Sequence, residues 1–361
     1  MIILPANANI LVVKFNAIGD LVMTTPTLRD LRTTYPSAHL TLMVGSWSAP
    51  VIRNDPHLDA VLEFDQDIFL RRRWSDLFRL LQEVRRRRFD AVVILHALIP
   101  VHLFFLLAGI PLRFGMARNG RDFFLTRSVP EEFEPGRYYG AKYQQVAALA
   151  GARIGSEVPE LPVSAADESS ARTLLAEGGL PAGADFLLVA PGGGRNPRTD
   201  MEAKRWPIAH FVGAIRLLSA RHPDLRIVVA GAESDRAETE AVARQIPEVV
   251  DLTGRVTLTQ LAAVARASRA VLCNDSSMLH LGVAVDVPVV VPFGPTSARQ
   301  LVPENAREFV WQSGIACSPC YRVGSGVHFP GCPIKYQCQR DAVPELLLPH
   351  LERALGRTSA R

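Results

Sequence analysis

The chain has 361 residues, which is more than one ordinary domain needs and suits two. Its hydrophobic content of 48% is ample for two packed cores. A formal charge of +4 and a pI near 8.9 favour anionic partners such as phosphates or an acidic membrane face. No RNA-binding or helix-turn-helix signature occurs, so nucleic acid is excluded from the expected partners.

The amino terminus lacks the basic start and the small-residue cleavage site of a secretory signal, which favours a cytoplasmic protein. Residues 91–112 contain no Asp, Glu, Lys or Arg over about the length of a membrane span. Prolines, a glycine and two histidines interrupt this stretch. We therefore predict a buried strand over 91–95 and a core-facing helix over 101–109 instead of a span.

The first half alternates between strand and helix patterns. An apolar run at 10–15 is followed by a turn at 16–20 and a predicted helix over 21–33. Further strands are predicted at 40–44, 61–64 and 91–95, with helices between them. This alternation predicts a parallel, doubly wound sheet. The first turn is not GxGxxG, so a dinucleotide is not indicated.

An arginine-rich segment over 71–88 has apolar residues at 74, 77, 78, 81 and 84, which form one helical stripe. We expect the run to be a solvated helix face whose carboxyl-terminal cations suit the helix dipole. The alternative is that Arg85–Arg88 contact acidic lipid headgroups or a phosphorylated acceptor.

The second half begins after a segment rich in Pro, Gly, Ser and Glu over 155–183, with one predicted helix at 169–177. A second α/β series follows, and it predicts another Rossmann-like sheet and a ligand cleft between the two halves. Its strands are expected at 186–190, 226–230, 249–252, 271–273 and 287–293, and its helices at 208–220, 235–245, 258–267 and 278–284.

Asp20 stands directly after Gly19, in the first strand-to-helix turn. One interpretation is that Asp20 only caps the helix that starts at Leu21. The other is that its carboxylate faces a cleft and accepts a proton from an attacking hydroxyl.

Several residues at predicted strand ends of the second half suit a nucleotide diphosphate. Gly192, Gly193 and Gly194 could close backbone amides around a phosphate, although a glycine run is also typical of a flexible loop. Lys204 precedes a helix start and could bind the diphosphate, and Glu233 follows a strand at the height of a ribose-binding carboxylate.

The turn Asn274-Asp275-Ser276-Ser277 follows a buried strand and opens a short helix that contains His280. The first amides and the positive dipole end of that helix would then point at an anion on the turn. The alternative is that Asp275 and Ser276 only cap the helix. Together with the glycines, Lys204 and Glu233, these residues predict a nucleotide-diphosphate pocket.

These motifs give the chain a resemblance to glycosyltransferase family 9, the ADP-heptose:lipopolysaccharide heptosyltransferases. The resemblance runs almost end to end, and its most specific part pairs Gly19-Asp20-x5-Pro26 with the late Asp-Ser-x3-His-Leu segment. It implies an α/β fold of the GT-B type, in which two Rossmann-like, doubly wound parallel sheets face a cleft. It also implies an inverting, metal-independent transfer of heptose from ADP-heptose to a lipopolysaccharide core hydroxyl, without a catalytic cofactor.

The resemblance assigns a role to individual residues. Asp20 would be the general base, and Lys204 with the Asp275–Ser277 turn would hold the diphosphate. Glu233 would bind the ribose, Val256 would contact the adenine, and His280 would lie nearby. The family commonly has glycine at the position of Ser277, so the approach of a phosphate there is expected to be narrower.

Four of the five cysteines lie close together late in the sequence. The C-x2-C pair Cys317–Cys320 is followed by Cys332 and Cys338, and the spacing allows a structural zinc or iron site. The second pair is spaced more widely than is usual, which leaves free thiols as the alternative.

We expect three segments: an acceptor-binding domain over 1–165, a nucleotide-sugar-binding domain over 166–343, and a helix over 344–361 that returns toward the first domain. Besides the ADP-sugar and the lipopolysaccharide core, an acidic inner-membrane surface is an expected peripheral partner. One alternative is a GT-B enzyme that uses another nucleotide sugar, or a protein or other glycan acceptor. A second is a sugar-nucleotide-binding protein without catalysis.

Overall fold

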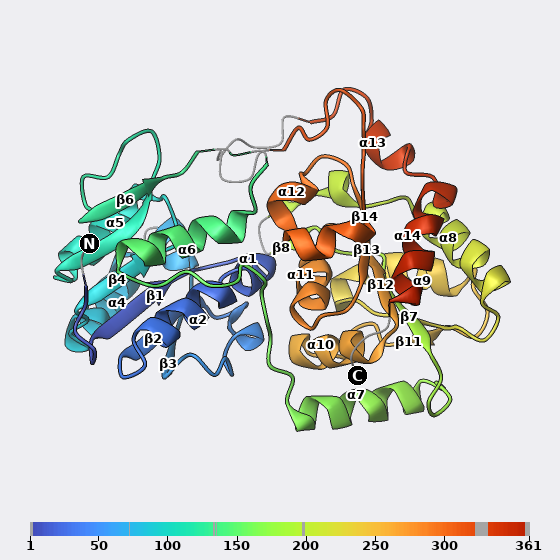
Figure 1. The fold of residues 1–361 in the computed structure, drawn as a ribbon, viewed down its shortest axis with the longest axis horizontal. Coiled ribbons are helices and arrows are strands. Elements are labelled where there is room, and N and C mark those ends of the chain that lie inside the picture. Colours follow the sequence, from blue (N-terminus) through green and yellow to red (C-terminus); the bar gives the residue numbers. More distant parts are fainter. Residues whose placement is uncertain are drawn as a thin grey trace. The chain divides into compact units, whose positions relative to one another are not determined.

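The computed structural model describes residues 3–357 except 72, 133, 135, 197–198 and 322–330. The chain divides into two compact units, Met1–Pro159 and Glu160–Arg361 (Figure 1). The predicted boundary after residue 165 falls at the start of the first helix of the second unit. Among the described residues, no helix combines the length and the apolar character that a membrane span requires.

Unit 1 is built on a parallel sheet with the strand order β3-β2-β1-β4-β5-β6 in its described part. The order reverses direction between β1 and β4, so this pair marks the switch point of a doubly wound sheet. The strands are β1 (Asn9–Val13), β2 (His39–Gly45), β3 (Ala60–Phe64), β4 (Ala91–Ile94), β5 (Leu112–Ala117) and β6 (Arg127–Pro130). The helices are α1 (Ile18–Val22), α2 (Thr25–Thr34), α3 (Asp67–Leu70), α4 (Trp74–Arg86), α5 (Ile99–Leu107) and α6 (Tyr139–Leu149), with the 3-10 turn η1 (Ala49–Val51).

The apolar stretch over 91–112 folds as predicted, into a strand and a helix. Every residue of β4 is buried, as expected for a parallel strand that is covered on both faces. Helix α5 follows it and buries Val101, Phe104 and Phe105 in the core of the unit. The sequence prediction of a core element is therefore confirmed.

One prediction for unit 1 is wrong. The helix expected over 21–33 is two helices, because the chain breaks at Met23–Thr24 and α2 restarts with Pro26 in its first turn, where proline is favoured. The apolar stripe of α4 is divided between the core and the surface, because Leu77, Leu81 and Val84 pack on the core cluster. Leu80 and Val84 are buried, whereas Trp74 and Phe78 are 70% and 60% exposed.

Unit 2 repeats the plan with the described strand order β11-β10-β7-β12-β13-β14, all paired in parallel. Here the order reverses between β7 and β12. The strands are β7 (Phe186–Ala190), β8 (Arg195–Asn196), β9 (Thr199–Asp200), β10 (Arg226–Val229), β11 (Val250–Asp251), β12 (Ala270–Cys273), β13 (Val289–Phe293) and β14 (Val310–Gln312); β8 and β9 form a separate antiparallel pair. The helices are α7 (Ala165–Glu177), α8 (Ile208–Arg221), α9 (Arg236–Ala243), α10 (Leu258–Ala267), α11 (Ser277–Ala284), α12 (Ala298–Leu301), α13 (Gln337–Arg340) and α14 (Pro344–Gly356), with the 3-10 turns η2 (Glu202–Lys204), η3 (Glu233–Asp235) and η4 (Glu304–Phe309).

The last helix, α14, belongs to the core of unit 2. Leu347, Leu351 and Ala354 are buried in the same cluster as Phe211 and Ile215 of α8. Its amphipathic pattern continues past Pro349, which lies inside the helix. A return of this helix toward unit 1 stays a prediction.

Candidate active site

The switch point of unit 2 brings two distant loops together. The side chain of Asn274, which follows β12, donates from Nδ2 to the carbonyl oxygens of Pro191 and Gly192 at 2.7 and 3.0 Å. Its Oδ1 accepts from the backbone N–H of Trp206 at 2.8 Å. Asn274 is fully buried, so the bonds tie the loops after β7 and β12 at the carboxyl edge of the sheet, where open α/β folds bind ligands.

Glycine is required in the loop after β7. Gly193 has a φ of +95°, and a Cβ at this position would lie 2.5 Å from the Cβ of Ser276. Gly194 has a φ of +75°, and its Cβ would meet the carbonyl oxygen of Met201 at 3.0 Å. The glycine run therefore lies against the turn at Ser276 in a backbone conformation that favours glycine.

The carboxylate of Asp235 accepts hydrogen bonds from this loop. Its Oδ1 accepts from the N–H of Gly193 and from Arg195 Nη1, each at 3.0 Å, and its Oδ2 accepts from the N–H of Ala232 at 3.1 Å. Arg205 Nε donates to the carbonyl oxygen of Gly193 at 3.0 Å. The amide of Gly193 thus points at a carboxylate in this structure.

Lys204 and Asp275 form an ion pair next to the glycine loop. Lys204 Nζ lies 2.8 Å from Asp275 Oδ2, and the hydroxyl of Thr296 donates to the same oxygen at 2.7 Å. Asp275 is buried, and the Lys204 side chain is 16% exposed. Lys204 Nζ also lies 5.8 Å from the ring centroid of Tyr321. The site therefore holds one cation within reach of solvent and one buried carboxylate that fixes it.

Helix α11 begins at the same place. Ser276 is its N-cap residue, but its side chain makes no capping hydrogen bond, and Asp275 bonds to Lys204 and Thr296. The interpretation in which these two side chains only cap the helix therefore does not describe the structure. Ser277 is the first residue of the helix and is half-buried, and His280 is buried at 7% exposure. The positive end of α11 is directed at the turn that carries these residues.

Glu233 lies at the carboxyl end of β10, as predicted, but its carboxylate is paired. Arg236 Nε and Nη2 donate to its two oxygens at 2.5 and 2.6 Å, and these bonds lower the pKa of Glu233 below its usual value. A Cβ on Gly254, which has a φ of +69°, would lie 2.5 Å from Glu233 Oε2. Val256, two residues further on, is half-buried. Glu233 and the loop that carries Val256 are thus adjacent.

In unit 1, Asp20 lies in the first helix after β1, and Gly19 beside it is buried. Asp20 is not the N-cap residue that the sequence suggests. It is the third residue of α1, and its Oδ2 accepts from the N–H of Ala17, the actual N-cap, at 3.3 Å. Lys14 Nζ lies 3.1 Å from the same oxygen, and the Lys14 side chain is 5% exposed against 32% for Asp20. A buried cation therefore holds a carboxylate that solvent reaches.

Aromatic and imidazole groups surround this pair. Lys14 Nζ lies 4.9 Å from the ring centroid of Tyr143, whose pKa is raised well above its usual value by burial and then by the Asp20 charge. His96, two residues beyond the end of β4, accepts from the N–H of Phe15 through Nε2 at 2.8 Å. Burial, and then the charge of Lys14, lowers the pKa of His96 well below its usual value, so the imidazole is neutral.

The four late cysteines are all described, as free thiols. Burial, followed by neighbouring Cys320 and Cys332, raises the pKa of Cys338 to about 11, so these sulfurs lie near one another. In the described part of the chain, however, no group of three or more His, Cys, Asp or Glu residues is arranged to hold a metal ion. The thiols as placed here do not fit a zinc or iron site.

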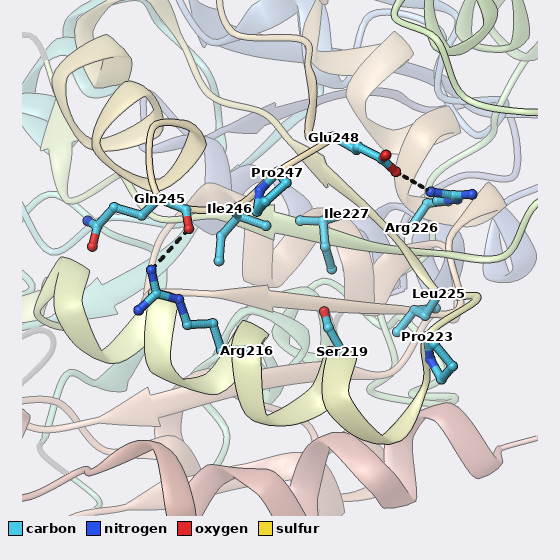
Figure 2. Close-up of a pocket in the computed structure, with 10 residues that line it drawn as sticks. All are labelled: Arg216, Ser219, Pro223, Leu225, Arg226, Ile227, Gln245, Ile246, Pro247 and Glu248. Atoms are coloured by element: carbon cyan, nitrogen blue, oxygen red, sulfur yellow. Dashed lines mark hydrogen bonds and ion pairs between the residues drawn. The ribbon is translucent and has the colours of Figure 1, made fainter.

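A surface cavity of about 270 Å³ in unit 2 lies elsewhere (Figure 2). It is lined by Pro223, Leu225 and Arg226, at the amino end of β10, so it opens at the opposite edge of the sheet from Asp275. Its two arginines are paired with other lining residues, Arg226 with Glu248 at 2.7 Å and Arg216 with the carbonyl oxygen of Gln245 at 3.1 Å. We do not take it as the functional site.

The structure adds four residues that sequence reasoning missed. Lys14 was the one charged residue in an apolar strand pattern, which is a usable signal, because a buried charge needs a partner. Asn274 belongs to the turn after a buried strand, and its local sequence gives no sign that it bonds to a distant loop. Asp235 and Thr296 are common turn residues, and nothing in their local sequence distinguishes them from helix caps.

Comparison with known proteins identifies a family. Residues 77–327, well over half of the chain, match the model for glycosyltransferase family 9 (heptosyltransferase). The chain is also 27% identical to lipopolysaccharide heptosyltransferase 2 of Salmonella typhimurium, over 80% of this chain and 83% of that protein.

Solved structures share the fold. A family 9 glycosyl transferase from Veillonella parvula has a TM-score of 0.82 at 20% identity, covering 98% of this chain and 99% of that one. The ADP-heptose lps heptosyltransferase II of E. coli has a TM-score of 0.72 at 22% identity, with 96% and 98% covered. The predicted α/β class with two Rossmann-like parallel sheets of the GT-B type is thus confirmed.

Proposed function

The chain belongs to glycosyltransferase family 9, and from this premise we propose that it transfers heptose from ADP-heptose to a hydroxyl of the lipopolysaccharide core. Its relatives with lipopolysaccharide heptosyltransferase names support this donor and acceptor. The fold and the family make the chain a glycosyltransferase; the sugar, the acceptor and the mechanism are the proposal.

The observation that carries the proposal is the constellation at the switch point of unit 2. A lysine, the positive end of α11 and a glycine loop meet there, and the lysine is fixed by a buried carboxylate at 2.8 Å. A diphosphate needs this combination of a fixed cation and oriented amides. We assign the diphosphate to Lys204 and the turn Asp275–Ser277, with the glycines 192–194 as the loop that closes beside it and His280 nearby.

The nucleoside part would extend toward β10 and β11. Glu233 would accept from the ribose hydroxyls and Val256 would contact the adenine. Because Arg236 holds both oxygens of Glu233, a ribose would have to share or replace that ion pair. The side chain of Ser277, where the family commonly has glycine, would face the phosphate from the first turn of α11.

The chemistry needs a base and a stabilised leaving group. The acceptor hydroxyl oxygen attacks the anomeric carbon while the bond from that carbon to the β-phosphate oxygen breaks on the opposite face, which inverts the configuration. Asp20 takes the hydroxyl proton, and Lys14 at 3.1 Å holds its carboxylate in place. Lys204 and the α11 dipole stabilise the charge that develops on ADP, so the proposed transfer uses neither a divalent ion nor another cofactor.

We further propose that the enzyme works in the cytoplasm at the inner face of the inner membrane, where a lipid-linked acceptor is presented. The positive charge of the chain supports a peripheral contact with an acidic surface. A structural metal at the four cysteines is not part of the proposal, because their placement does not fit one.

The test is mass spectrometry of the product formed from ADP-heptose and a panel of truncated cores. The proposal expects a mass gain of one heptose on a heptose-deficient core. Thermal shifts with ADP, UDP and GDP should show the largest stabilisation for ADP. A larger shift with UDP or GDP, together with no transfer from ADP-heptose, would favour a GT-B enzyme with another donor. ADP binding without transfer to any acceptor would favour a binding protein.

A further inference from the structure

Two neighbouring helices of unit 1 expose large apolar side chains. On α4, Trp74 and Phe78 are 70% and 60% exposed. On α5, Leu103, Leu106 and Leu107 are 37%, 38% and 52% exposed. Single exposed apolar residues need no explanation, but a group that includes a tryptophan and a phenylalanine marks an interaction surface.

The two helices lie next to each other at their last turns. Helices α4 and α5 cover the same face of the sheet, because both contribute to one core cluster with β1 and β4 (Figure 1). Arg85 Nε and Nη2 donate to the carbonyl oxygen of Leu107 at 3.1 and 2.8 Å, which joins the last turns of the two helices. Trp74, Phe78 and Arg85 share one side of α4, since they are four and seven residues apart. The side of α4 that carries the exposed rings is therefore the side next to α5.

On α5, the exposed leucines form one outward face. Leu103, Leu106 and Leu107 have the i, i+3, i+4 spacing of a single helical face. The residues that alternate with them, Phe104 and Phe105, are buried in the core. The leucines thus cannot reach the core without unfolding the helix, and their exposure is built into the sequence.

Arginines lie at one end of this apolar surface. Arg85, Arg86 and Arg88 are exposed at the end of α4. Arg85 is bonded to Leu107, whereas no described residue pairs with the guanidinium of Arg86 or Arg88, which distinguishes them from Arg87, paired with Glu83 at 2.8 Å. A Trp, Phe and Leu surface with adjoining uncompensated arginines matches an anionic bilayer interface, in which rings and leucines enter the acyl boundary and guanidinium groups meet phosphates.

We propose that the exposed faces of α4 and α5 form a membrane-docking surface, defined by Trp74, Phe78, Leu103, Leu106 and Leu107 with Arg86 and Arg88, that lies in the interface of an anionic bilayer. This inference deepens the proposed function by naming the surface that brings the enzyme to a lipid-linked acceptor. The contact is interfacial, consistent with α4 and α5 being short helices that bury their other faces in the core.

The test is co-sedimentation of the full chain with vesicles of phosphatidylcholine, with and without phosphatidylglycerol. The double variant Trp74→Ser/Phe78→Ser should lose about ten-fold or more in vesicle partitioning. Arg86→Gln/Arg88→Gln should lose about 25-fold on anionic vesicles, since each arginine near such a surface contributes about five-fold, and little on neutral ones. Leu346→Ser and Arg172→Gln, exposed positions in unit 2, are matched controls that should bind like the parent.

The outcomes separate this surface from the catalytic proposal. All variants should transfer heptose to a lipid-free, truncated core at the parent rate, because none of the changed residues lies in the site. Parent-like vesicle binding by Trp74→Ser/Phe78→Ser would overturn the assignment of this surface to membrane docking, even if heptose transfer is observed. Self-association of the parent that this variant abolishes, without vesicle binding, would assign the surface to a second copy of the chain instead. Vesicle binding in the expected pattern by a protein that transfers no heptose would leave the surface standing and overturn the function.

Discussion

Replacing Lys204 by Met separates the structural and the ligand-binding roles of one ion pair. The change leaves Asp275, which is 4% exposed at its side chain, without its cation at 2.8 Å. Loss of one partner of a buried pair costs about 3–5 kcal/mol. Because Thr296 still donates to the carboxylate, we expect the lower end, about 3 kcal/mol of unfolding free energy. For a unit of this size that lowers the melting temperature by about 6–12 °C.

The same variant should bind ADP less tightly. A hydrogen bond to a charged group contributes about 1.5–3 kcal/mol, which corresponds to a loss of about 10- to 150-fold in ADP affinity. The double variant Lys204→Met/Asp275→Asn removes both charges. Its stability should return to within about 1 kcal/mol of the parent, while the ADP affinity stays low.

Calorimetry provides both readouts: scanning for stability and titration for ADP. Arg226→Met is the matched control, because Arg226 pairs with Glu248 at the opposite edge of the same sheet. This control should leave ADP affinity unchanged. Parent-like ADP affinity in Lys204→Met would refute the assignment of Lys204 to the diphosphate. A double variant as unstable as the single one would refute the argument from the buried charge.

Three further predictions concern other parts of the chain. Lys14→Met should lower kcat with little change in the KM for ADP-heptose, because Lys14 positions Asp20 and lies in a different unit from the donor-binding residues. Lys14→Arg should recover part of the rate. Steady-state kinetics of both variants would check this. Dialysis against a chelator should leave turnover within about two-fold of the untreated enzyme, since Lys204 and α11 supply the positive charge; an activity that returns only with added metal would contradict it. Brief iodoacetamide treatment at pH 8 should leave Cys273 and Cys338 unmodified in the folded protein. Both thiols are buried and their pKa values are raised, that of Cys338 to about 11. Peptide mass spectrometry before and after unfolding in urea would show whether they are modified.

Much of the fold was predictable because its strands are buried on both faces. Continuous apolar runs such as Phe186–Ala190 and Ala91–Ile94 are typical of parallel strands that are covered on both faces, and both are strands. The helix Leu258–Ala267 was also predictable. It has an amphipathic pattern, and the capping box from Thr257 to Gln260 marks its start.

Sequence spacing did not fix which apolar residues of α4 reach the core. The apolar residues of α4 fit one helical stripe, of which Leu77, Leu81 and Val84 pack on the core. Trp74 and Phe78 remain exposed. The short strands β5 and β6 were not predicted, because Arg113 and Arg127 interrupt their apolar pattern.

The sequence predicted where the site residues lie in the fold, but it did not predict which side chains pair with each other. The sequence places Gly192–Gly194 and Asp275 at one edge of the sheet, because each follows a strand. The structure brings them together there. That Asp235 accepts from Gly193, or that Arg236 holds Glu233, depends on side-chain directions that sequence spacing does not fix. The roles of these residues in catalysis and binding stay predictions.

The most direct test of the account compares turnover and ADP binding in Asp20→Asn. The substitution keeps the shape of the side chain and removes its ability to accept a proton, so kcat should fall by about 10²- to 10⁴-fold while the ADP dissociation constant stays within about two-fold. Asp90→Asn, an exposed carboxylate just before β4 at the opposite edge of the same sheet, should leave both unchanged. Parent-like turnover in Asp20→Asn would contradict the account, because the base would then be another group.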